Sequence, residues 1–119
     1  MNIPSSSGDS PLEISQIALI DQLKLPSLEK HHLRLLMHCL ESFKLMQTQV
    51  KTNNLPSKKQ QLDWCLANPR LANDKEFISI LMNQFEVAAL YLEKLALTLE
   101  ISPLELTLDD LILDALSSG

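Results

Sequence analysis

The sequence predicts an all-α fold: a single-domain bundle of four to five helices with one long central helix. Leucine occupies 26 of the 119 positions, valine only two and glycine only two, so strand formers and glycine turns are scarce. Five segments with helical apolar spacing each follow a proline or capping signal. One hydrophobic core is expected over residues 10–119, and residues 1–9 are expected to form a mobile N-terminal tail.

The first predicted helix covers about 11–23. Ser10, Pro11 and Glu13 form a helix-start signature, in which the serine accepts from free amides and the glutamate reaches back. Leu25 precedes Pro26, and a residue before proline is disfavoured in the helical region, so the helix ends there.

The second predicted helix begins after a Ser27 cap and ends near Gln49. Its apolar arc includes Leu28 as well as leucines further along the helix, and one histidine, His32, falls inside that arc. The opposite side is expected to be polar and solvated, and consists of Arg34, His38, Glu41 and Ser42.

The third and fourth helices carry capping boxes. Ser57 with Gln60 opens a short helix that ends at Asn68, before a proline. Asn73 with Glu76 opens the longest helix, about 74–101, whose length of about 42 Å predicts an elongated bundle, a kink or a protruding end. The side chains expected to be buried between this helix and the second one are Leu36, Leu40, Leu81, Phe85, Ala88 and Leu92.

The last helix, about 107–117, has two possible starts. Ser102 repeats the Ser-Pro-Leu-Glu signature of the first helix. Thr107, followed by Asp109 and Asp110, offers a second start, at which the carboxylates complement the helix dipole.

The sequence contains no recognisable motif for catalysis or for metal or cofactor binding. The sequence has no CxxC, HExxH, Gly-x-Ser-x-Gly or glycine-rich phosphate loop. His31 and His38 stand about 10 Å apart along a helix, too far to share one ion, and His38 with Glu41 would supply only two ligands. We therefore expect no enzyme and assign no catalytic, cofactor or metal residues. His32 is either a structural histidine or a pH-sensitive contact.

Charge is unevenly distributed along the chain. The net charge is −5, yet residues 24–59 hold seven Lys/Arg and two Asp/Glu, whereas residues 61–119 hold three and ten. An acidic total disfavours non-specific nucleic-acid binding. The basic segment 24–59 nevertheless makes a nucleic-acid-associated regulator the alternative function.

The compartment expected from the sequence is the cytoplasm. Cys39 and Cys65 both lie in apolar helical patterns, which is typical of free buried thiols. Neither a signal-peptide pattern nor a run of about 18 apolar residues is visible, so no membrane partner is expected.

The leading functional hypothesis is a small non-catalytic adaptor or accessory protein that works by helix-on-helix contact. On the longest helix, a second apolar strip lies about half a turn from the buried seam. Unless helix 11–23 or 107–117 covers it, this strip would bind another protein or a second copy of the chain. The predicted contact residues are Leu90, Glu93, Leu97, Glu100 and Ile101.

Overall fold

The computed structural model describes residues 14–118, and this part of the chain contains helices and no strand. The predicted all-α class is therefore confirmed. In chain order the elements are α1 (Ile14–Asp21), α2 (Ser27–Met46), α3 (Lys58–Ala67), α4 (Lys75–Leu99), the 3-10 helix η2 (Pro103–Glu105) and α5 (Leu108–Ser118). The proposed tail and the Ser10 cap lie outside the described residues.

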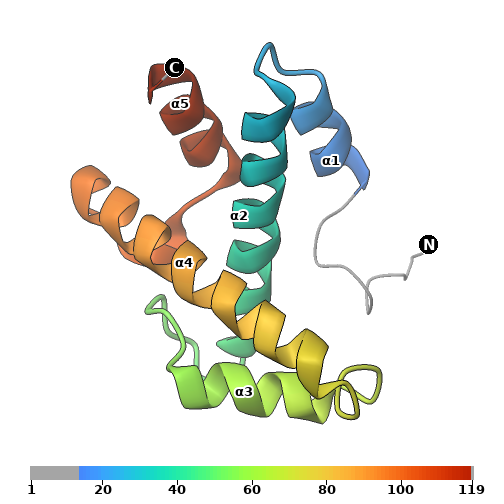
Figure 1. Cartoon of the computed structure of the whole chain (residues 1–119). Coiled ribbons are helices and arrows are strands. Elements are labelled where there is room, and N and C mark those ends of the chain that lie inside the picture. The colour runs from blue at the N-terminus through green and yellow to red at the C-terminus, as the bar shows by residue number, and fades with distance from the viewer. Residues whose placement is uncertain (1–13, 119) are drawn as a thin grey trace, which may run out of the picture.

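Helix α2 is the element on which the other helices pack. It packs against α1, α3, α4, α5 and η2, whereas the longer α4 packs mainly against α2, α3 and η2. Figure 1 shows α4 crossing α2 diagonally, α3 beneath the crossing, and α1 and α5 on opposite sides of the N-terminal half of α2. The overall dimensions are 39 × 32 × 31 Å.

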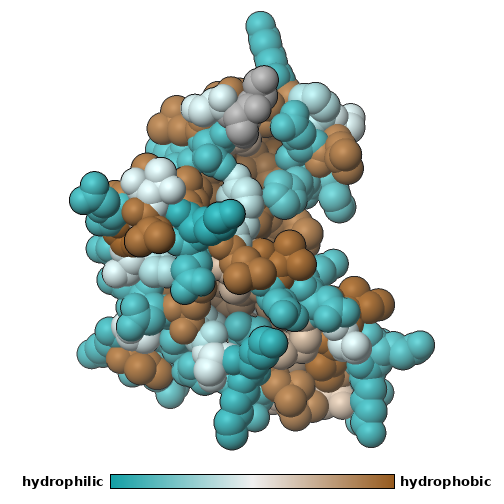
Figure 2. All heavy atoms as spheres, turned by 60° about the vertical axis from the view of Figure 1, so that its left-hand side comes forward, coloured by the Kyte–Doolittle hydropathy of each residue, from teal (hydrophilic) through white to brown (hydrophobic). Residues whose placement is uncertain are grey.

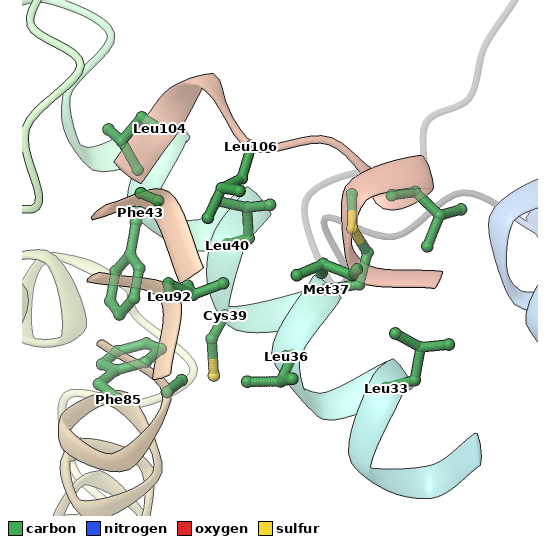
Figure 3. Close-up of a cluster of buried hydrophobic side chains, with 14 of the residues drawn as sticks. Leu33, Leu36, Met37, Cys39, Leu40, Phe43, Phe85, Leu92, Leu104 and Leu106 are labelled. Carbon is green, nitrogen blue, oxygen red and sulfur yellow. The ribbon is translucent and has the colours of Figure 1, made fainter. Parts of the chain in front are cut away.

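The core is centred on the crossing of α2 and α4. The rings of Phe43 and Phe85 are both fully buried and their centroids lie 5.2 Å apart, and the Trp64 ring lies 6.3 Å from that of Phe85. Leucines from α2, α4 and the segment around η2 surround these rings (Figure 3). All six side chains expected in the core are at most 7% exposed, which confirms that prediction: Leu36, Leu40, Leu81, Phe85, Ala88 and Leu92.

Two predicted helix starts have the expected hydrogen bonds. At α3 the Gln60 amide donates to Ser57 Oγ over 3.1 Å, and the Ser57 amide donates to Gln60 Oε1 over 2.8 Å. At α5 the Thr107 amide donates to Asp110 Oδ2 over 2.9 Å. The second of the two possible starts is therefore the one that opens α5.

Three other starts differ from prediction. Ser27 is the first residue of α2 rather than its cap, because Pro26 occupies the capping position. Asp74, not Asn73, caps α4 and accepts from the amide of Phe77 over 3.0 Å. Ser102 precedes the single 3-10 turn of η2 instead of an α-helix.

The C-terminal end of α4 comes two residues earlier than predicted. Glu100 adopts a left-handed conformation, with φ of 60°, and the amide of Ile101 donates back to the carbonyl of Ala96 over 3.0 Å. The helix has 25 residues, or about 37 Å, which matches the longest dimension of the protein. Helix α2 likewise ends at Met46, before the predicted Gln49.

Two side chains of α2 are placed opposite to expectation. Ser42 is buried, and its hydroxyl donates to the carbonyl of His38 over 3.0 Å. Leu28, expected in the apolar arc, is 78% exposed. Ser42 adjoins the buried Phe43 near the crossing with α4, so a small polar residue is enclosed there, whereas no other helix covers Leu28 in the first turn of α2.

Tyr91 connects α4 to its neighbours at the upper end of the bundle. Its hydroxyl donates to the Asp114 carboxylate on α5, and the ring of His32 on α2 lies edge-on to it, with centroids 5.6 Å apart. Burial, followed by the hydrogen bond to and the charge of Asp114, raises the pKa of Tyr91 to about 12. His32 itself is exposed, so its predicted place in the apolar arc is wrong.

Replacing Leu92 with alanine should lower the free energy of unfolding by about 2–5 kcal/mol, because the side chain is completely buried. The matched control is Leu97→Ala on the same helix, where the side chain is 79% exposed and the change should stay within about 0.5 kcal/mol. Urea denaturation of the two variants measures both values. Equal decreases in the free energy of unfolding for the two variants would contradict this assignment of the inner and outer faces of α4.

Tyr91 is the sole tyrosine, so its ionisation can be followed directly by ultraviolet absorbance of the phenolate. We expect a midpoint near pH 12 in the folded chain, and a lower midpoint in Asp114→Asn. Since the pKa in the folded chain lies above the ordinary value of 10, this group's contribution to stability is complete below about pH 10 and is lost as the pH rises to about 12. If Tyr91 ionised with a midpoint at pH 10 while the circular dichroism signal of the helices persisted, the proposed effect of Asp114 on the pKa of Tyr91 would be contradicted.

Candidate functional site

The predicted contact strip lies on the outer side of α4, turned away from α2. Its two helical leucines are open to solvent, with Leu90 61% exposed and Leu97 79% exposed. Neither α1 nor α5 covers them, although the helices predicted at 11–23 and 107–117 were the two that could have done so. In Figure 2, where the side with the C-terminal end of α4 comes forward, apolar side chains are set among hydrophilic ones.

The other three predicted contact residues occupy different environments. Glu93 and Glu100 are exposed, as a rim of charge requires. Ile101 is half-buried and packs against the core, because the helix has already ended before it. The strip on the helix is therefore shorter at its C-terminal end than the sequence predicts.

An open cleft of about 560 Å³ lies beside the strip. It is bounded by the last turns of α4, by the loop that precedes α3 and by η2. Two hydrogen bonds fix the loop that forms one side of the cleft. Gln47 Nε2 donates to the carbonyl of Asn54 over 3.1 Å, and the amide of Leu104 donates to the carbonyl of Asn53 over 2.9 Å. Three predicted contact residues line the cleft: Glu93, Leu97 and Ile101.

The exposed apolar surface of α4 extends further toward its N-terminus than the predicted strip. Ile80 is 54% exposed and Val87 is 62% exposed. At 100° per residue they lie within a 100° arc that also holds Leu90 and Leu97. We call these four residues the outer face of α4. The missed signal was the seven-residue spacing of Ile80 and Val87, which matches that of Leu90 and Leu97.

Most basic side chains of the segment 24–59 have a partner within the chain. Five of its seven basic side chains contact acceptors of the same chain. Lys44, for example, donates to the carbonyl of Leu106 over 3.0 Å and lies 3.6 Å from a Glu41 oxygen. Arg34 pairs with Asp21 at 2.6 Å. The half-buried pairs of Arg34 and Lys44 weaken the nucleic-acid alternative, because phosphate binding needs uncommitted cations.

The buried thiols are poor nucleophiles. Burial raises the pKa of Cys39 to about 12 and also raises the pKa of Cys65, so both thiols stay protonated near neutral pH. Burial lowers the pKa of His38, which favours its neutral form. Within residues 14–118, no group of three or more His, Cys, Asp or Glu side chains converges in a way that could hold a metal ion.

Membrane-spanning segments are absent from the described residues. None of these helices is long and apolar enough to cross a bilayer.

Comparison with known proteins supplies a family. No curated protein and no solved structure matches the chain. The model of the family described as "NDH complex assembly factor CRR9" matches residues 12–117, which cover all of the described helices but the final residue of α5. The matched range includes the outer face of α4 and the residues that line the cleft. The chain therefore belongs to the family of NDH complex assembly factor CRR9.

Proposed function

We propose that this chain is a non-catalytic assembly factor that binds a protein component of an NDH complex through the outer face of α4. The family description supports an accessory role in assembly. The observation that carries the proposed site is the exposure of aliphatic side chains along one helix, up to 79% at Leu97. An exposed row of this kind is typical of a protein contact surface.

The surroundings of this face suit a contact surface better than a reaction site. The cleft beside it is lined by both apolar and charged side chains, among them Leu55, Glu93 and Lys94. Both buried cysteines lie elsewhere, in α2 and α3. A partner helix lying on α4 would cover the aliphatic side chains, and the charged rim would orient it.

Affinity capture with the full chain tests this function. In extracts of cells that assemble an NDH complex, the wild-type chain should enrich NDH subunits, as identified by mass spectrometry. Leu97→Glu should abolish the enrichment while the chain stays folded. The side chain at this position is 79% exposed, so water solvates the new charge in the free chain, whereas a bound partner would bury it.

The matched control is Leu28→Glu at the start of α2, where the side chain is 78% exposed. This variant introduces the same charge on a different element and should retain the enrichment. Recovery of no NDH subunit by the wild-type chain would contradict the assembly role. Full recovery by Leu97→Glu would instead contradict the site.

A further inference from the structure

The outer face of α4 has the residue spacing of one strand of a coiled coil. Positions spaced by alternating steps of three and four residues run along it from 80 to 97, and all of them are exposed. In a heptad these are the a and d positions, which insert between the side chains of a facing helix. This seam is about 27 Å long. Its a positions are Ile80, Val87 and Lys94, and its d positions are Asn83, Leu90 and Leu97.

Glutamates border this seam along one edge. Glu86 and Glu93 both fall at the g position of the heptad, and both are exposed. Glu86 lies 3.6 Å from Lys58 Nζ, but the two side chains are 54% and 76% exposed, so water screens this pair and a partner's cation can replace it. The edge therefore offers negative charge to a facing helix.

A second copy of the chain is a poor match for this seam. In a parallel in-register pair, Lys94 would face Lys94 of the other copy across the a layer. The facing e positions would be Gln84, Tyr91 and Thr98, none of which is basic. In an antiparallel pair, g faces g, so Glu86 and Glu93 would repel the same residues of the other copy. Neither orientation places a basic side chain at the edge positions that face Glu86 and Glu93.

We infer that the outer face of α4 binds a helix of a different protein, with an apolar heptad seam and with Lys or Arg facing Glu86 and Glu93. An acidic residue of that helix would face Lys94. This inference rests on the proposed function and adds the chemistry of the partner. The cleft beside Leu97 offers a recess in which a large apolar side chain of the partner helix could anchor.

Two synthetic helical peptides of about three heptads test the inference. They share an Ile/Leu seam with one Glu opposite Lys94, and they differ only at the edge that faces the glutamates, where one carries Lys and the other Glu. Fluorescence anisotropy with the full chain should give about tenfold tighter binding for the Lys peptide. The preference should reverse in the double variant Glu86→Lys/Glu93→Lys.

A charge-matched control separates local pairing from the overall field of the protein. The double variant Asp63→Lys/Asp109→Lys changes the net charge equally at exposed sites on α3 and α5 and should keep the preference for the Lys peptide. Equal binding of both peptides, or binding of neither, would overturn the inference. So would a dimer of the chain in light scattering that Leu97→Glu dissociates. Recovery of NDH subunits in the capture experiment is independent of these outcomes, so the two proposals can fail separately.

Discussion

The contact between Phe43 and Phe85 is the constraint on which the rest of the structure depends. Their rings meet at 5.2 Å where α2 and α4 cross, and neither has any exposed surface. Because α4 rests on α2 through this inner seam, its opposite side necessarily faces outward. The buried Leu92 and the exposed Leu97 lie only five residues apart on one continuous helix. The candidate binding surface is thus a direct result of how the core is packed.

Helix starts, which depend on neighbours in sequence, were predicted only in part: two have the expected hydrogen bonds, whereas Ser27, Asn73 and Ser102 do not cap an α-helix. The Ser57–Gln60 capping box and the start of α5 at Thr107 involve residues three apart, so their chemistry can be read from the sequence. The placement of Ser42 and Leu28 could not be read in the same way. Both depend on which other helices surround each turn of α2, and that is a property of the assembled fold.

The candidate surface was predicted in part, for similar reasons. Leu90 and Leu97 follow from helical periodicity alone, and Ile80 and Val87 have the same seven-residue spacing. The helical position expected for Ile101 was wrong, because Glu100 ends α4 in a left-handed conformation, which a non-glycine residue adopts only when its surroundings favour it. Whether α1 or α5 covers the strip required the three-dimensional arrangement of the helices.

Under the proposed function, the two sides of α4 are subject to different evolutionary pressures. Substitutions on the inner seam change the packing at the crossing with α2, so selection on that side acts through folding of the chain itself. The outer face contributes little to folding, and residues there can change without loss of the fold as long as they still match what they bind. The inner and outer columns of residues along this one helix should thus diverge at different rates among members of the family, and changes in the outer column should accompany changes in the proposed partner.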